Sequence, residues 1–373
     1  MKKVVILQEY VPTYREPLFR RLIQLGEANG IAISVAAGHP EGSQSRRGDV
    51  SGADFVLPLR QREIRIAGKR VVFRRIKPII DGADLVVVEQ ARRNLDAYGL
   101  LLSRERFPRV ALWGHGKDYV KPATAVDARL QKFLTLRSDW FFAYTRSGAD
   151  AVKDLGFPAD KITTLSNSVD TTSLVRDASS ITENELVDFR ASLGLTEKVA
   201  VFVGGLDSSK RIPFLLEAAA IAHSLDSEFR LLVVGDGDQR ALVEDFSKRN
   251  RAIVYLGPLH GKDKAKALLS GSVIAMPGRV GLVAVDSFAL GRPIVTTTWP
   301  WHAPEYDYLQ PGLDSLAITD DVRSYGEGLS GLVSDKVRLL QLQRNCRDKA
   351  SDYTIEAMAD RFLAGIKRAV FEE

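Results

Sequence analysis

Residues 275–291 read AMPGRVGLVAVDSFALG, and they combine the end of a buried strand, a glycine-containing loop and an amphipathic helix. Gly278 and Gly281 flank the turn. A helix that begins near Gly281 directs free backbone N–H groups and the positive end of its dipole at the space in front of the strand. A phosphate fits there, and Asp286, further along the helix, could face a ribose or sugar hydroxyl. The alternative is an ordinary strand–helix turn with Asp286 on a solvated face.

Strand–helix units of the same kind fill the rest of the chain. Apolar runs rich in valine and isoleucine occur at residues 4–8, 31–37, 55–57, 71–73, 85–88, 110–113, 140–144, 199–204, 229–234, 253–256, 273–276 and 294–298. Segments of helical spacing separate them, which predicts parallel, doubly wound sheets. The polar stretch 171–196 is typical of a linker with one short helix.

The predicted fold is therefore α/β, with two Rossmann-like domains. We expect an N-terminal domain at residues 1–170, the linker at 171–196 and a second domain at 197–352. The helix predicted within residues 353–373 is expected to pack back across the domains. A length of 373 residues suffices for two separate cores.

Composition narrows the class of protein. The single cysteine, Cys346, excludes an internal disulfide and a cysteine-based zinc site. The N-terminal sequence MKKVVILQEY predicts a buried strand rather than a signal peptide, because Glu9 interrupts a short apolar run. No stretch reaches the apolar length of a transmembrane helix. We expect a cytoplasmic protein, peripheral at most to the inner face of the cell membrane, without a bound metal or cofactor.

Charge is distributed unevenly along the chain. Residues 1–170 carry a net charge of +9 and the remainder −4. The densest basic run, residues 60–77, holds eight Lys and Arg against Glu63 alone. A solvated edge and an anionic membrane surface both fit this run, with Arg70, Arg74 and Arg75 as the expected membrane contacts. No nucleic-acid-binding module accompanies it, so we expect an anionic membrane and not nucleic acid as a partner.

Ligands of open α/β sheets bind at the carboxyl ends of the strands, so the loops there are the candidate sites. These loops contain EYVPTYREP, GHGKDY, GGLDSSKR, GDGD and TWPWHAPEYDYL. Each has an ordinary structural role on its own, such as a tight turn or a helix cap, and their shared placement favours a binding site. Lys210 and Arg211 at a helix start oppose the helix dipole, which favours an anion beside them.

In this order, the motifs resemble the retaining glycosyltransferases of family 4, which have the GT-B fold of two Rossmann-like domains facing across a cleft. The resemblance covers most of the chain and is strongest over residues 199–309, in VFVGGLDSSKR, LLVVGDGDQRALVE, PGRVGLVAVDSFALGRPIVTT and APEYDYL. It implies metal-independent transfer of a hexose, with retention of configuration, from a nucleoside diphosphate to a glycan or lipid-linked acceptor. The setting it implies is cell-surface polysaccharide synthesis.

The resemblance also implies that residues 1–170 form the acceptor-side domain and residues 197–352 the nucleotide-sugar-binding domain. It further implies roles for individual residues. Lys210 would neutralise the diphosphate, Asp286 would hold the ribose, and His115 would contact the donor sugar. The catalytic candidates are His115, Lys210 and Arg211; the donor-binding candidates are Gly204, Gly205, Asp236, Gly278, Arg279, Val280, Gly281, Leu282 and Asp286; the acceptor-side candidates are Tyr14, Arg15 and Lys117.

Two departures from the family pattern leave alternatives open. The family pairs two glutamates eight positions apart, where this chain has Gly278 and Asp286. Gly205 stands where the family has an arginine, and Arg211 and Arg279 are the candidates to replace it. A nucleotide-sugar-binding protein without catalysis is therefore one alternative, and a GT-B-fold sugar-nucleotide epimerase is another. The loop PTYREP resembles one branch of bacterial cell-surface polysaccharide enzymes.

Overall fold

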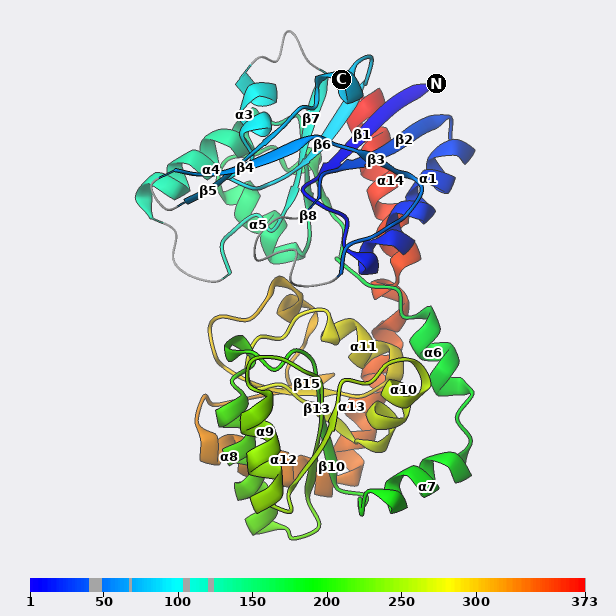
Figure 1. The fold of residues 1–373 in the computed structure, drawn as a ribbon, viewed down its shortest axis with the longest axis vertical. Helices are drawn as coiled ribbons and strands as arrows, with labels where there is room; N and C mark the ends of the chain where they lie inside the picture. The colour runs from blue at the N-terminus through cyan, green and yellow to red at the C-terminus, as the bar shows by residue number, and fades with distance from the viewer. Residues whose placement is uncertain (40–48, 67–68, 103–107, 120–123, 373) are drawn as a thin grey trace. The chain divides into compact units, whose positions relative to one another are not determined.

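The computed structural model describes residues 1–39, 49–66, 69–102, 108–119 and 124–372 (Figure 1). The chain forms two compact units, Met1–Asp170 with Thr354–Glu373 (unit 1) and Thr171–Tyr353 (unit 2). Each unit is built on a parallel sheet, which confirms the predicted α/β class. No helix in the described part of the chain is both long enough and apolar enough to cross a bilayer.

Unit 1 contains a seven-stranded sheet in the order β3-β2-β1-β6-β7-β8-β9, with every neighbouring pair parallel. The strands are β1 (Lys2–Gln8), β2 (Ile31–Ala37), β3 (Val56–Pro58), β6 (Leu85–Glu89), β7 (Arg109–Gly114), β8 (Trp140–Ala143) and β9 (Ile162–Thr164). Residues 4–7 of β1 are completely buried, as expected of a central strand that is covered on both faces.

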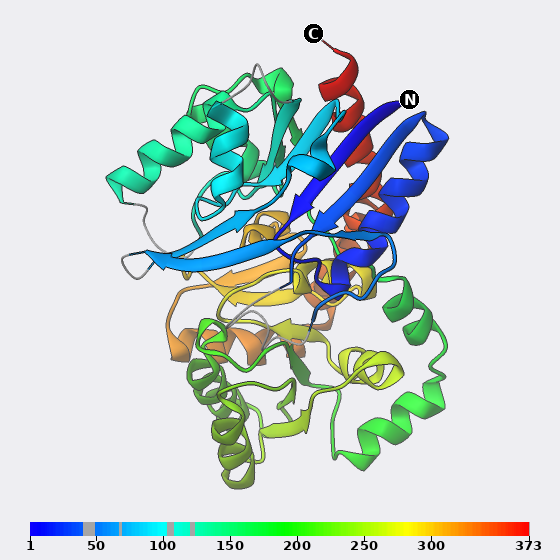
Figure 2. The same cartoon turned by 45° about the horizontal axis from the view of Figure 1, so that its top comes forward.

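Alternate side chains of β1 enter two different cores. Val4 and Ile6 pack with residues of α1 (Glu16–Ala28) and α14 (Ile355–Phe371), which lie side by side in Figures 1 and 2. Val5 and Leu7 pack in the other core, with residues of α3 (Leu95–Leu102), α4 (Ala125–Arg137) and α5 (Arg146–Asp154). The helix near the C-terminus therefore belongs to the core of unit 1.

The basic run forms a separate element. β4 (Gln61–Ile66) and β5 (Lys69–Arg74) pair antiparallel as a two-stranded sheet, followed by the short α2 (Lys77–Ile80). The prediction that residues 71–73 belong to the parallel sheet is wrong. Only one face of the hairpin is buried: Val72 and Arg74 are buried, whereas Arg62, Ile64 and Phe73, on the opposite face, are exposed.

The stretch 171–196 holds two helices rather than the one expected. They are α6 (Thr172–Ser179) and α7 (Glu183–Ser192), and both pack against α10 (Gly261–Ser270) in unit 2. A capping box begins α7: Thr182 accepts from the Glu185 backbone N–H, and the Glu185 carboxylate accepts from that of Thr182. The polar composition of residues 171–196 is typical of a linker, so the second helix was not predicted.

Unit 2 contains a six-stranded parallel sheet in the order β12-β11-β10-β13-β14-β15. Its strands are β10 (Val199–Val203), β11 (Arg230–Val234), β12 (Ile253–Gly257), β13 (Val273–Ala275), β14 (Ile294–Thr297) and β15 (Ser315–Ile318). Its remaining helices are α8 (Ile212–Leu225), α9 (Arg240–Arg249), α11 (Val283–Leu290), α12 (Val322–Ser334) and α13 (Lys336–Lys349). The strand order reverses between β10 and β13, so a ligand is expected at the carboxyl ends of these two strands.

Truncating Phe362 in α14 tests whether this helix completes the core of unit 1. Phe362 is fully buried, with its ring 5.0 Å from that of Trp113 and 4.5 Å from that of Phe142. Phe362→Ala should lower the free energy of unfolding by about 3–5 kcal/mol, measured by denaturant titration with tryptophan fluorescence. Phe371→Ala, on the same helix but 59% exposed, is the control and should change it little. Equal effects of the two would contradict this packing.

Candidate functional site

Two glycine loops pack against each other at the carboxyl ends of β10 and β11. A Cβ on Gly235 would collide with the carbonyl oxygen of Gly204, and one on Gly237 would lie 2.6 Å from that of Leu206. Both Gly235 and Gly237 have positive φ. The backbone N–H of Leu206 also donates to the Asp236 carbonyl (2.9 Å). The glycines therefore allow the two loops to meet backbone to backbone.

The loop after β13 packs equally closely on the short helix Ser208–Lys210. A Cβ on Gly278 would lie 2.5 Å from the carbonyl oxygen of Ser209. The Arg279 N–H donates to that same oxygen (2.9 Å), and the Lys210 ammonium donates to the carbonyl oxygen of Arg279 (2.6 Å). Gly278 therefore marks a close backbone approach, and its position has no room for the glutamate that the family resemblance leads one to expect.

The Lys210 side chain is largely enclosed by this loop. Burial lowers the pKa of its ammonium group, and the positive charge of Arg279 lowers it further. The negative charges of Asp207 and Glu305 raise this pKa and so oppose the shift. Glu305 is itself buried, on the short helix Pro304–Tyr308 that follows β14. Two cations, Lys210 and Arg279, and two carboxylates, Asp207 and Glu305, thus lie close enough to interact. A cation held there in a poorly solvated position interacts strongly with an added anion.

The N-terminus of α11 opens beside this group of charges. No side chain caps the helix: the N-cap residue is Leu282. Gly281 leaves the approach open, since the nearest atom to a Cβ built on it is 3.7 Å away. The helix dipole and the backbone N–H groups of this first turn form the kind of site that binds phosphate.

His302, from the loop after β14, holds the loop in front of α11. The Val280 N–H donates to Nδ1 of His302 (3.3 Å), and Nε2 lies 3.0 Å from the carbonyl oxygen of Thr297. A neutral imidazole with its proton on Nε2 satisfies both contacts. Burial lowers the pKa of this imidazole, which favours the neutral form. The Tyr306 ring stacks on it, with ring centroids 4.2 Å apart.

Arg211 is anchored at the ends of β14 and β15. Its guanidinium pairs with Asp320 and lies 4.1 Å from the Phe214 ring centroid. Arg211 also has φ +57, a left-handed conformation that is strained for a non-glycine residue. The structure brings Lys210 and Arg279 together and directs Arg211 toward Asp320.

The two predicted acidic donor ligands occupy different surroundings. Asp286, in the first turn of α11, accepts a hydrogen bond from Lys264 of α10 (2.8 Å). Asp236 is exposed, accepts from the Gly237 N–H (2.8 Å) and lies 3.8 Å from Arg240. Within the described residues, no group of three or more His, Cys, Asp and Glu side chains could hold a metal ion.

The remaining candidates lie in unit 1. His115 and Lys117 follow β7 and line a cavity of about 350 Å³ together with Gln90, Ala91, Arg92, Arg93, Asp118 and Gln131. Arg15 is buried, with its guanidinium 4.5 Å from the Trp113 ring centroid and 3.2 Å from the Tyr144 hydroxyl. Tyr14 is exposed. The Arg15 side chain therefore packs against Trp113 and Tyr144, whereas His115 and Lys117 line the cavity.

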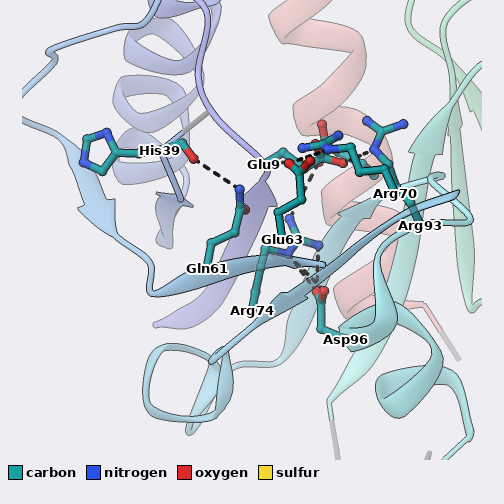
Figure 3. A network of polar contacts seen from close by, with 9 residues as sticks. Glu9, His39, Gln61, Glu63, Arg70, Arg74, Arg93 and Asp96 are labelled. Carbon is teal, nitrogen blue, oxygen red and sulfur yellow. Dashed lines mark hydrogen bonds and ion pairs between the residues drawn. The ribbon is translucent and has the colours of Figure 1, made fainter. Parts of the chain in front are cut away.

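A network of charges around the buried Glu9, at the carboxyl ends of β1 and β6, was missed from the sequence (Figure 3). Glu9, only 2% exposed, pairs with Arg70 of β5 and with Arg93. The Glu89 carboxylate accepts from the Glu9 N–H (2.8 Å), and burial raises the pKa of Glu89. Its members come from segments up to 84 residues apart, so sequence spacing gave no signal for it.

The same network corrects the interpretation of the basic run. Arg74 is 1% exposed and donates to both carboxylate oxygens of Asp96 at 2.6–3.0 Å. Arg70 pairs with Glu63 (2.6 Å) as well as with Glu9. Arg70 and Arg74 are therefore internal ion-pair partners rather than membrane contacts, whereas Arg75 is exposed, as expected.

Comparison with known proteins agrees with this geometry. Residues 197–335, which contain the paired loops, Lys210 and α11, match the family model described as glycosyl transferases group 1. The matched segment, 139 of the 373 residues, resembles this family. A similar protein, the phosphatidyl-myo-inositol mannosyltransferase of Mycobacterium leprae, is 28% identical over 133 residues, covering 33% of this chain and 36% of the relative. The chain thus spans about a third of the length of that relative.

Solved structures match this chain over nearly its full length. HepE of Anabaena in complex with UDP-glucose has a TM-score of 0.66 and 14% identity, covering 98% of this chain and all of HepE. The lipopolysaccharide outer core galactosyltransferase WaaB has a TM-score of 0.63 and 12% identity, covering 98% and 99% of the two chains. These matches confirm the predicted GT-B fold.

Adding a methyl group at Gly278 tests the close approach to Ser209. Gly278→Ala should lower the free energy of unfolding by about 1–3 kcal/mol, because the new Cβ overlaps backbone atoms that cannot rotate away. Gly281→Ala is the matched control, because a Cβ there would make only ordinary van der Waals contacts, the nearest at 3.7 Å. Denaturant titration of both variants measures the difference. A Gly278→Ala variant as stable as Gly281→Ala would refute the close approach.

Acid should destabilise the fold through His302. The pKa of its imidazole is lowered in the folded state, so the unfolded chain binds more protons as the pH falls below about 6.5. The free energy of unfolding should therefore decrease through that range, and His302→Gln should reduce the dependence on pH. His260→Gln, which alters an exposed histidine, should leave it intact. Denaturant titrations across a pH series provide the measurement.

Proposed function

We propose that the protein transfers a sugar, a hexose, from a nucleoside diphosphate to a glycan or lipid-linked acceptor, with retention of configuration. The observation that carries the proposal is the clustering of Lys210, Arg279 and the uncapped α11 N-terminus at the strand-order reversal of unit 2. A diphosphate is the ligand that these groups suit, because it needs both cations and directed N–H groups.

In the proposed reaction, an oxygen of an acceptor hydroxyl forms a bond to the anomeric carbon as the bond from that carbon to the phosphate oxygen breaks. The acceptor proton passes to the departing phosphate. Negative charge grows on the diphosphate during this step, and Lys210 and the α11 N–H groups are placed to stabilise it. These groups supply positive potential without a metal ion.

Asp286 is the proposed ribose ligand. Its carboxylate is one turn inside α11 and already accepts from Lys264, so a ribose hydroxyl would join an existing polar pair. The Val280–Gly281 backbone and Arg279 are proposed to contact the sugar in place of the missing glutamate. Gly204, Gly205 and Asp236 form the adjoining loop edge. The roles of His115 toward the donor sugar, and of Tyr14, Arg15 and Lys117 toward the acceptor, remain predictions from the resemblance.

The names of the relatives support the acceptor class. One relative is a phosphatidyl-myo-inositol mannosyltransferase and another is a lipopolysaccharide outer core galactosyltransferase. We propose by analogy a lipid-linked acceptor in cell-surface polysaccharide synthesis, met at the cytoplasmic face of the membrane. UDP-glucose, present in the HepE complex, is the first donor to test.

One observation supports a second candidate, a nucleotide-sugar-binding protein without catalysis. Gly278 replaces the first family glutamate, and its surroundings exclude any side chain. A screen of UDP-, GDP- and ADP-sugars by calorimetry and by donor hydrolysis separates the candidates. Binding with turnover supports the transferase, and binding without hydrolysis or transfer to any acceptor supports the second candidate. An absence of binding to every donor would overturn both.

Removing the Lys210 ammonium tests its role in this reaction. Lys210→Ala should slow sugar transfer, or donor hydrolysis where no acceptor is known, roughly 100-fold, as expected for the loss of one charge-stabilising donor. Lys248→Ala removes an exposed cation from α9 in the same unit and should keep the wild-type rate. The proposed role is wrong if both variants turn over the donor equally fast.

A further inference from the structure

The outward face of the β4–β5 hairpin carries cations and apolar side chains together. In the antiparallel register, Arg62 lies opposite Phe73 and Ile64 opposite Val71, and the Arg75 N–H donates to the Arg60 carbonyl (2.9 Å), which extends the pairing. Directly opposed residues of an antiparallel pair point to the same side. We call Arg60, Arg62, Ile64, Phe73 and Arg75 the outer face of the hairpin.

The opposite, inner face fixes the hairpin to unit 1. Val72 is fully buried, and its N–H donates to the Arg93 carbonyl (2.8 Å). Arg74 pairs with Asp96, and Arg70 with Glu9 and Glu63 (Figure 3). Glu63, the one acidic side chain of the two strands, therefore points inward. The acidic partners of this region are used on the inner face, and the outer face keeps an excess of positive charge.

The apolar members of the outer face are unusually accessible. Phe73 is 54% exposed and Ile64 is 49% exposed, and they are diagonal neighbours in the register. Arg60, Arg62 and Arg75 surround them and are all exposed. A purely solvated edge gains nothing from a phenylalanine and an isoleucine placed side by side in water. A ring and an aliphatic chain bordered by arginines match the boundary between lipid headgroups and acyl chains.

We propose that the outer face of the β4–β5 hairpin docks on an anionic lipid bilayer. The arginines pair with lipid phosphates, and Phe73 and Ile64 enter the upper acyl region. The ion pairs of the inner face hold the ribbon in place, so that docking needs no refolding of the hairpin. The inference deepens the proposed function, on which it rests for its choice of a lipid surface; vesicle binding and donor binding are separate measurements, so each can fail alone.

The test is co-sedimentation of the full chain with phosphatidylglycerol–phosphatidylcholine vesicles and with phosphatidylcholine vesicles. Wild-type protein should bind the anionic vesicles, with weakening as salt is added, and should not bind the neutral ones. Arg62→Gln with Arg75→Gln should weaken binding roughly 30-fold, since each cation near an anionic surface contributes roughly five-fold. Ile64→Ser with Phe73→Ser should also weaken it, although the charge is unchanged.

Matched controls come from α13 in unit 2, which also exposes arginines beside apolar side chains. Arg338→Gln with Arg344→Gln removes the same charge, and Val337→Ser with Leu340→Ser removes side chains that are 81% and 62% exposed. Both control pairs should sediment like wild type. Circular dichroism and calorimetry with UDP-glucose show whether each variant is folded and still binds a donor.

Three results would overturn the proposal. The first is equal loss of binding in hairpin and α13 variants, which indicates a general charge effect. The second is unchanged binding in both hairpin variants together with loss in Phe133→Ser with Leu136→Ser, which would assign docking to the exposed apolar side chains of α4. The third is binding to a DNA duplex as tight as to anionic vesicles and independent of Ile64 and Phe73, which would make the surface a nucleic-acid contact.

Discussion

The proposed donor site of unit 2 depends on one close backbone contact, between Gly278 and the carbonyl oxygen of Ser209. Because Gly278 has no side chain, the loop after β13 lies directly on the Ser208–Lys210 helix, and this allows Lys210 to donate to the Arg279 carbonyl. His302 and the backbone of Ala303 hold the same loop from its other side. The loop is thus fixed on two sides before any ligand arrives, and this preorganisation is what electrostatic stabilisation of a leaving group requires.

Much of the fold was readable in the sequence because its signals are local. Apolar runs such as those of β1 and β10 are buried on both faces, and glycines at the strand ends mark the loops that meet. The start of α11 beside Gly281 was readable for the same reason. The β4–β5 hairpin was assigned to the wrong sheet because a short apolar run looks alike in a central strand and in a ribbon with one buried face.

The partners of charged side chains were not readable. Arg70 and Arg74 belong to a run that looks uniformly basic, but their carboxylate partners Glu9 and Asp96 lie 61 and 22 residues away in the chain. Similarly, only the folded structure shows that Asp286 pairs with Lys264 and that Arg211 pairs with Asp320. The sequence gives the number of charged side chains in a segment. Only the folded structure shows which of those side chains form ion pairs.

The packing of α14 has a consequence for biosynthesis. Met358, Phe362 and Ile366 complete the core over β1, yet the ribosome makes them after the whole of residues 171–353. Until α14 is made, one side of the sheet formed by the first 170 residues is covered only in part, by α1, while the second unit emerges and can already fold. The unit that is synthesised first is the last to be finished, and a nascent chain stalled before residue 354 would expose an apolar sheet surface that chaperones and proteases recognise.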